Sequence, residues 1–331
     1  MKAMVMTAVG NTDVLNLAQL PEPEIIYPTD VKVRLYAAGV NPVDTKIRRN
    51  GLFFDLPLPA VLGCDGAGEV VAVGEGVYHV KVGDKVWFCH GGLGREPGTY
   101  AEFSVLDQCL LGVMPSNLDF INAAACPLVL ITAWGALFDK GALRAGQSVL
   151  IHAGAGGVGH VAIQLAKMHG ARVITTVGSS EKAQWVRSLG ADEVINYREY
   201  DFVAAVNELT YGQGVDLVVD TVGSEVFKKS IAATAHFGRL ITLLDPGNVD
   251  LKEARLRNLL IGFELMLTPM LRDLAVARSH HLTILNQCRK WIEQGKLSIT
   301  VSRCFPLDQA REAHAAIETG HTQGKLVLTM I

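Results

Sequence analysis

The chain has 331 residues, of which 49% are hydrophobic and 19% charged, enough to bury the cores of about two domains. Its formal net charge of -3 gives no electrostatic reason to expect binding to nucleic acid or to acidic membranes. The six cysteines are scattered and form no C-x-x-C pair, which argues against a disulfide framework and a structural zinc lobe. The N-terminus lacks a signal-peptide core, and no apolar run reaches the roughly 18 residues of a membrane helix. We therefore expect a soluble, cytoplasmic protein.

The segment from Met1 to about Ile121 consists of short apolar runs separated by glycine and proline turns. Val31, Val33 and Leu35 alternate with polar residues as in a half-buried strand, and the runs at 67–73 and 85–88 predict two more strands. This composition indicates a β-rich, partly barrel-shaped domain.

After Asn122 the pattern changes. An apolar helical stretch (123–141) is followed by strands at 148–153, 171–177, 193–196, 215–220 and 239–244, with helices between them. This alternation predicts an α/β fold with a doubly wound parallel sheet. A long amphipathic helix (275–295), a helix at 307–319 and a strand at 325–330 come last. We predict a dinucleotide-binding domain at 123–267 and a catalytic domain formed by 1–122 together with 268–331.

A glycine-rich turn follows the first strand of the second domain, and a helical pattern follows the turn. Its spacing, G-x-G-x-x-G, is the dinucleotide fingerprint when it connects a strand to a helix. Gly154 permits a tight turn, Gly156 lets the backbone approach a pyrophosphate, and Gly159 lets the helix close on the strand. The helix N-terminus then meets the anion. The predicted cofactor-binding turn comprises Gly154, Ala155, Gly156, Gly157, Val158 and Gly159.

Motifs along nearly the whole chain give it a family resemblance. They are the segments 39–51, 62–77, 82–86, 98–103, 131–137, 152–159, 189–197 and 324–328. In this order they make the chain resemble the medium-chain dehydrogenase/reductase superfamily, and within it the zinc-independent quinone oxidoreductases, the zeta-crystallin-like branch. The resemblance implies a Rossmann domain, a GroES-like catalytic domain and a homodimer.

The zinc alcohol dehydrogenases of this superfamily carry a cysteine where this chain has Asn41, and a His-Glu pair where it has Cys64 and Asp65. Their third ligand falls near Leu128. Catalytic zinc needs three protein ligands and an open position, so we predict no metal. Without a Lewis acid to ionise an alcohol, the reaction expected is reduction of an acceptor that is already electrophilic, a quinone or a conjugated enone.

The second strand of the predicted sheet indicates NADPH. An NAD enzyme has an acidic residue at the end of this strand, whereas this chain continues with TTVGSSEK. Lys182 is placed to meet a 2′-phosphate, with Ser179 or Ser180 as a hydrogen-bond donor, although Lys182 could also be a solvated surface residue. The resemblance adds Tyr197 as a phosphate contact. It also implies a C-terminal basic residue where this chain has Gly320 and His321, and Lys325 is near this position but is not a clear match.

The resemblance places Asn41 beside the nicotinamide, where its amide could donate to a substrate carbonyl. A turn residue before Pro42 is an equal alternative. Asp44 orients this loop. Thr132 resembles a residue at the nicotinamide end, or it bonds back to its own helical turn. Leu243 and Leu244 end the fifth strand, where the resemblance implies backbone contacts to the carboxamide.

Phe53 and Phe54 stand where some related enoyl reductases place a tyrosine proton donor. They suit a flat hydrophobic substrate or belong to the core. Solvent or a cofactor hydroxyl is then the expected source of the proton. The leading expectation is an NADPH-dependent quinone or enone oxidoreductase. The alternatives are an enoyl-thioester reductase and a catalytically weak NADPH-binding or structural protein.

Overall fold

The computed structural model describes residues 1–330 and divides into two compact units. Unit 2 is the continuous segment Val129–Met266, and unit 1 combines Met1–Leu128 with the chain from Leu267 onward. The predicted boundaries after residues 122 and 267 lie close to these divisions.

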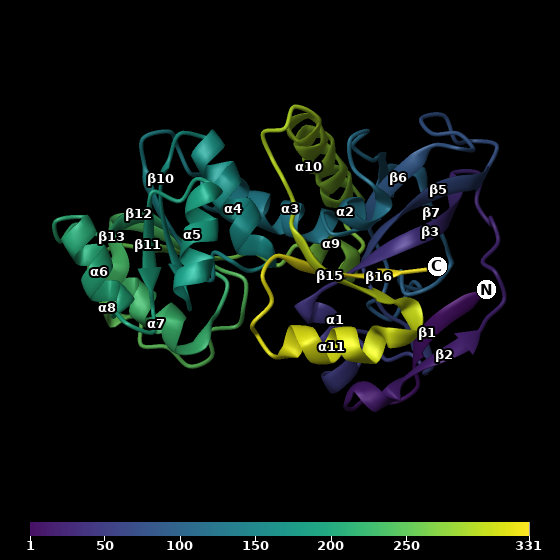
Figure 1. Ribbon diagram of the computed structural model, residues 1–331, viewed down its shortest axis with the longest axis horizontal. Coiled ribbons are helices and arrows are strands. Elements are labelled where there is room, and N and C mark those ends of the chain that lie inside the picture. Colours follow the sequence, from purple (N-terminus) through teal and green to yellow (C-terminus); the bar gives the residue numbers. More distant parts are fainter. Residues whose placement is uncertain (331) are drawn as a thin grey trace. The chain divides into compact units, whose positions relative to one another are not determined.

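Unit 2 contains a six-stranded parallel sheet in the order β11-β10-β9-β12-β13-β14. This is the order of the doubly wound dinucleotide-binding fold, which confirms the predicted α/β class. The helices α4 and α5 lie on one side of the sheet, and α6, α7 and α8 lie on the other (Figure 1). The strands are β9 (Ser148–Ile151), β10 (Arg172–Val177), β11 (Glu193–Asn196), β12 (Val215–Asp220), β13 (Thr234–Thr242) and β14 (Leu260–Phe263). The helices are α4 (Gly157–Met168), α5 (Ser180–Ser188), α6 (Phe202–Leu209), α7 (Ser224–Ala233) and α8 (Lys252–Leu256).

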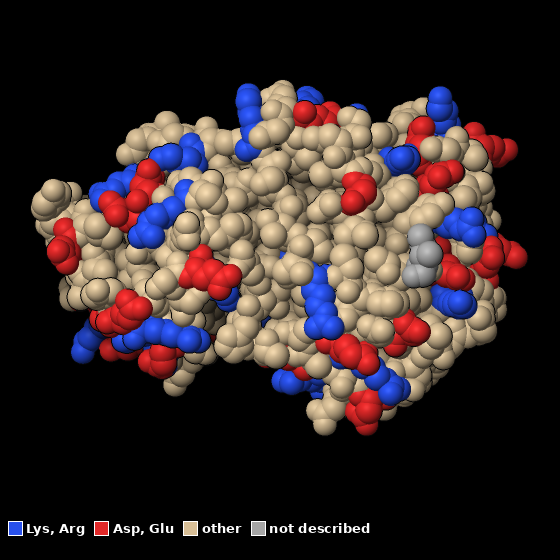
Figure 2. Space-filling model, viewed as in Figure 1, with Lys and Arg blue, Asp and Glu red and all other residues tan. Residues whose placement is uncertain are grey.

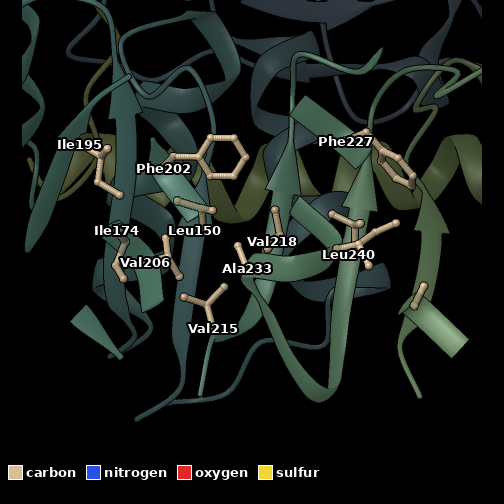
Figure 3. Packing of buried hydrophobic residues seen from close by; sticks show 12 residues of the cluster. Leu150, Ile174, Ile195, Phe202, Val206, Val215, Val218, Phe227, Ala233 and Leu240 are labelled. Atoms are coloured by element: carbon tan, nitrogen blue, oxygen red, sulfur yellow. The ribbon is translucent and has the colours of Figure 1, made fainter. Parts of the chain in front are cut away.

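A buried apolar cluster packs α6 and α7 against this sheet. Figure 3 shows Phe202 and Phe227 above the strand residues Leu150, Val218 and Leu240. Each fully buried side chain of this size contributes about 1.5–3 kcal/mol relative to exposure. The branched and aromatic residues that predicted the strands are therefore the residues that hold the helices in place.

Two segments of unit 2 differ from the sequence prediction. The fifth strand, expected at 239–244, begins at Thr234 because Thr234 pairs with Val215, and it ends at Thr242. Leu243 and Leu244 therefore follow the strand rather than ending it. The sixth strand, β14, lies at the edge of the sheet in a segment for which no strand was predicted.

Unit 1 is β-rich, as predicted. Its larger sheet has the order β15-β16-β3-β5-β6-β8, with β7 paired to β3, and a smaller sheet has the order β2-β1-β4. The strands are β1 (Lys2–Met6), β2 (Leu15–Gln19), β3 (Asp30–Val40), β4 (Ala60–Val61), β5 (Asp65–Val73), β6 (Lys85–Cys89), β7 (Phe103–Asp107), β8 (Leu111–Val113), β15 (Val301–Pro306) and β16 (Lys325–Thr329). The helices are α1 (Pro42–Asn50), α2 (Phe120–Ala124), α9 (Thr268–Leu271), α10 (Ala275–Glu293) and α11 (Ala310–Glu318), and α3 (Pro127–Trp134) spans the division between the units.

The C-terminal segment completes unit 1 through β16. This strand pairs antiparallel with β3, so that Leu326 lies opposite Val40. Two segments almost 300 residues apart in sequence thus become neighbours at the end of β3.

On the face shown in Figure 2, acidic and basic side chains are intermixed. Among residues 1–330, no helix has both the length and the apolar character needed to cross a bilayer.

Candidate functional site

The glycine turn of unit 2 lies between β9 and α4. Its left-handed residue is Ala153, with φ 49°, rather than Gly154. A Cβ at Gly154 would lie 2.0 Å from Thr175 Oγ1 on the neighbouring strand, and a Cβ at Gly159 would lie 2.3 Å from Ala153 O. The packing of strand, turn and helix therefore requires glycine at both positions.

Gly156 has a different environment. It is the N-cap of α4, and a Cβ there would approach only Ala153 O, at 3.2 Å. The space in front of this backbone is open, so a ligand can approach it closely. The first N–H groups of the 12-residue helix α4 provide donors and a positive dipole end for an anion. These residues fit a dinucleotide pyrophosphate.

Three of the residues predicted to bind a 2′-phosphate, Ser179, Lys182 and Tyr197, belong to the segments that follow β10 and β11. Ser179 is the N-cap of α5, and its Oγ accepts a hydrogen bond from Lys182 N at 3.3 Å. Tyr197 follows β11, and its hydroxyl lies so close to Gly178 that a Cβ there would be 2.6 Å away. The exposed Glu181 lies in the first turn of α5 rather than at the strand end. β10 is therefore followed by the Ser179 hydroxyl and has the Tyr197 hydroxyl beside it, with no acidic residue at its end.

The remaining cofactor and catalytic candidates of unit 2 lie at other strand ends and in α3. Leu243 N donates to Asp220 O at 3.0 Å, and Leu244 N donates to Thr242 Oγ1 at 3.2 Å. The loop after β13 is thus tied to the end of β12. Thr132 is buried within α3.

In unit 1, Asn41, Asp65 and Lys325 form a buried polar cluster at the end of β3. Asn41 Nδ2 donates to Asp65 Oδ2 at 2.9 Å, and Lys325 Nζ donates to Asn41 Oδ1 and, at 3.2 Å, to Val40 O. The ammonium is also 3.8 Å from Asp65 Oδ2, whose partner oxygen Oδ1 accepts from Leu128 N at 2.8 Å. The Lys325 residue is only 3% exposed. Its ammonium is committed to this cluster, and we do not propose it as a phosphate contact.

Asp44 fixes the loop that carries Asn41. Its Oδ2 accepts from Asn41 N at 2.8 Å, which caps helix α1, and from the Tyr100 hydroxyl at 3.0 Å. Tyr100 in turn contacts His314 Nε2 at 3.2 Å. Burial raises the pKa of Asp44 to about 7. Its Oδ1 has no hydrogen-bond partner among residues 1–330. This environment supports the predicted orienting role of Asp44.

The sequence did not reveal the contacts of Lys325, Tyr100 and His314. Lys325 and Tyr100 lie in motifs of the family resemblance, GKLVL and GTYAEF, which was the available signal, whereas His314 lies in none of these motifs. The contact of Lys325 with Asn41 spans 284 residues of sequence and that of Tyr100 with His314 spans 214, so only the fold brings them together.

A cavity of about 320 Å³ lies beside the loop after α1. It is lined by Met6, Val9, residues 51–56 and Leu58, and thus includes both predicted aromatic residues. Phe53 is half-exposed, and the Arg95 guanidinium lies 4.4 Å from the centre of the Phe54 ring. These side chains line a cavity instead of filling the core, as a site for a flat apolar molecule requires.

The positions that bind zinc in the zinc alcohol dehydrogenases do not form a zinc site here. Asn41 and Asp65 converge on an ammonium, and Leu128 contributes a backbone N–H donor. The Cys64 thiol has a raised pKa, because burial and the carboxylates of Asp44 and Asp65 outweigh the opposing hydrogen bond with Cys89. Within residues 1–330, no three His, Cys, Asp or Glu side chains are grouped so as to hold a metal ion. The residues present do not fit zinc.

Comparisons with known proteins agree with this architecture. A family model described as alcohol dehydrogenase GroES-like domain matches residues 27–116, and one described as zinc-binding dehydrogenase matches residues 189–328. A quinone oxidoreductase of Pseudomonas aeruginosa is 36% identical, over 99% of both chains. A chloroplastic NADPH-dependent alkenal/one oxidoreductase of Arabidopsis thaliana is 34% identical, over 99% of this chain and 79% of that protein. The crystal structure of an Escherichia coli quinone oxidoreductase complexed with NADPH superposes with a TM-score of 0.88 at 30% identity, covering 99% of this chain and 100% of that one.

Proposed function

Because the chain belongs to the medium-chain dehydrogenase/reductase superfamily and is an oxidoreductase of that group, we propose that it transfers hydride from NADPH to a quinone or an α,β-unsaturated carbonyl compound. Its relatives include a quinone oxidoreductase and an alkenal/one oxidoreductase, and the NADPH complex of its Escherichia coli neighbour supports the cofactor. The observation that carries the proposal is the Lys325 ammonium between Asn41 and Asp65, where the zinc enzymes have metal ligands. A site with an ammonium in place of metal ligands suits an acceptor that is electrophilic without activation by a metal ion.

The glycine turn and the N-terminus of α4 would hold the pyrophosphate of NADPH. Ser179, Lys182 and Tyr197 would hold its 2′-phosphate, since a phosphate prefers hydroxyl and ammonium donors and is repelled by an acidic residue. The bound cofactor supplies the hydride. No step involves zinc, because the residues that would hold it do not fit.

On the acceptor side we assign a donor role to Asn41. Its Nδ2 carries two hydrogens, and among residues 1–330 it has one acceptor, Asp65 Oδ2. A buried N–H without an acceptor is costly, and a carbonyl oxygen of the acceptor molecule would satisfy it. Asp44 keeps this donor in place by capping α1. The proton that completes the reduction comes from solvent or from a cofactor hydroxyl.

A panel of acceptors tests the proposal. The purified chain is incubated with NADPH or NADH and with 1,2-naphthoquinone, a simple enone or an enoyl thioester, and oxidation of the nicotinamide is followed at 340 nm. We expect turnover with NADPH and a quinone or enone. Turnover confined to enoyl thioesters would replace the proposal with an enoyl-thioester reductase. Tight NADPH binding without turnover on any acceptor would indicate a cofactor-binding protein.

We also propose that the chain forms a homodimer through β14. This strand is at the edge of the sheet in unit 2, and Leu260, Phe263 and Leu265 are about half exposed there. An exposed apolar edge strand is a template for pairing with another strand, and a second copy offers the same edge. The predicted cytoplasmic location is supported by the free thiols of all six cysteines.

A further inference from the structure

The buried ammonium of Lys325 donates a hydrogen bond to the side-chain oxygen of Asn41. This contact is not needed to balance the charge of Asp65. An asparagine amide has two orientations that differ by exchange of its oxygen and nitrogen. The neighbours of Asn41 distinguish these orientations, because the lysine is only a donor and an ionised Asp65 is only an acceptor. Lys325 Nζ meets Oδ1, and Asp65 Oδ2 meets Nδ2 at 2.9 Å.

The ammonium is itself held by the fold. β16 pairs with β3 and places Lys325 at the point where β3 ends, with Val40 O at 3.2 Å from Nζ. Asp65, the first residue of β5, is fixed from its other side by Leu128 N at 2.8 Å. Both neighbours of the amide therefore lie on strands, and each is also hydrogen-bonded to a backbone group. Neither side chain can rotate away from Asn41 without breaking these contacts.

From this arrangement we propose that Lys325 is a positioning residue, which locks the Asn41 amide in one orientation and aims its remaining N–H at the carbonyl oxygen of the acceptor. The ammonium holds the amide through its oxygen, at the position where the zinc enzymes have a metal ligand. The inference rests on the proposed function for the identity of the acceptor, but the orientation of the amide is independent of it.

The test separates charge balance from positioning. Lys325→Met removes the ammonium and leaves Asp65 as a buried unpaired carboxylate, so we expect a large loss of thermal stability. The double variant Lys325→Met/Asp65→Asn removes both charges, and most of the lost stability should return. Asp65→Asn alone keeps the lysine against Asn41 Oδ1. Lys167→Met, which breaks an exposed ion pair with Asp192 in unit 2, is the control for loss of a lysine.

We expect the double variant to have a kcat with the best acceptor at least tenfold below that of the unchanged protein, and an unchanged Kd for NADPH, because a displaced donor slows the chemical step without weakening cofactor binding. Asp65→Asn should lose only a few-fold, and Lys167→Met should lose nothing. A double variant that recovers kcat together with stability would overturn the proposal, since Lys325 would then only balance Asp65.

A second readout does not depend on activity. The two Nδ2 protons of Asn41, assigned in a ¹⁵N spectrum by their loss in Asn41→Asp, should be well separated and slow to exchange in the unchanged protein. In the double variant they should move toward the chemical shifts of an asparagine in an unstructured chain and exchange faster with solvent. If they keep their positions, the amide is not locked by Lys325. If they shift while no acceptor is reduced even by the unchanged protein, the positioning holds and the proposed function fails.

Discussion

Adding one methyl group at Gly154 measures how tightly the glycine turn packs on its neighbouring strand. In Gly154→Ala the new Cβ would lie 2.0 Å from Thr175 Oγ1 and 3.0 Å from Ile163 Cδ1. To reach ordinary van der Waals contact, the hydroxyl must retreat by about 1.4 Å (3.4 minus 2.0). Thr175 is fully buried, and its Oγ1 donates to Ile151 O at 2.7 Å, so this movement breaks a hydrogen bond.

Overpacking of this kind costs about 1–3 kcal/mol, and the lost hydrogen bond adds about 1 kcal/mol. We therefore expect Gly154→Ala to lower the free energy of unfolding of unit 2 by about 2–4 kcal/mol. Thr175→Ala alone should lower it by about 1 kcal/mol, for the hydrogen bond. In the double variant the hydroxyl is absent and the nearest strand atom is Thr175 Cβ at 3.1 Å. Its stability should then be close to that of Thr175→Ala.

Urea denaturation without cofactor measures these differences, because a mutation that changes the midpoint but not the slope has changed stability. Gly156→Ala is the matched control, since its Cβ would meet only Ala153 O at 3.2 Å. It should leave stability nearly unchanged but weaken NADPH binding. The reasoning is refuted if Gly154→Ala is as stable as the unchanged protein, or if the double variant is less stable than Gly154→Ala.

Three further predictions concern other regions. Lys182→Ala should raise the Kd for NADPH about tenfold or more and leave the Kd for NADH unchanged, because a charge-assisted contact to the 2′-phosphate is lost. Fluorescence titration with each cofactor measures both Kd values, and equal changes for the two cofactors would contradict the assignment of Lys182. Burial beside Arg278 lowers the pKa of His90 to about 3, so the unfolded chain binds a proton there between about pH 3 and 6.5 that the folded protein does not. The stability that depends on neutral His90 is therefore fully present above about pH 6.5 and is lost as the pH falls. His90→Gln should reduce the slope of the unfolding free energy against pH by up to about 1.4 kcal/mol per pH unit. An unchanged slope between about pH 5 and 6.5 would show that His90 is not held neutral. Leu260→Lys should convert a dimer to monomers in sedimentation velocity, and a dimer that persists would exclude β14 as the interface.

Local pattern was sufficient for most of the fold. The strands β11 and β12 lie at the residues predicted for them, and the parallel, doubly wound type of the sheet in unit 2 follows from the alternation of strands and helices. The strand β14 was not predicted, because four residues at a sheet edge with side chains partly in water have neither an alternating nor a continuous buried pattern. The roles of glycines depend on neighbours too: the backbone turn is made by Ala153, and Gly154 is required by a threonine on another strand.

The sequence by itself determined that a dinucleotide site exists between a strand and a helix, that no acidic residue ends the next strand, and that zinc ligands are missing at Asn41 and Leu128. Each of these features depends only on which residue types stand at short spacing along the chain, so the sequence alone shows them. Only the tertiary structure decided what takes the place of the metal ligands. Lys325 reaches Asn41 because an antiparallel pairing brings the last strand to the end of β3. Such a contact between distant segments depends on register and burial, which no local pattern contains.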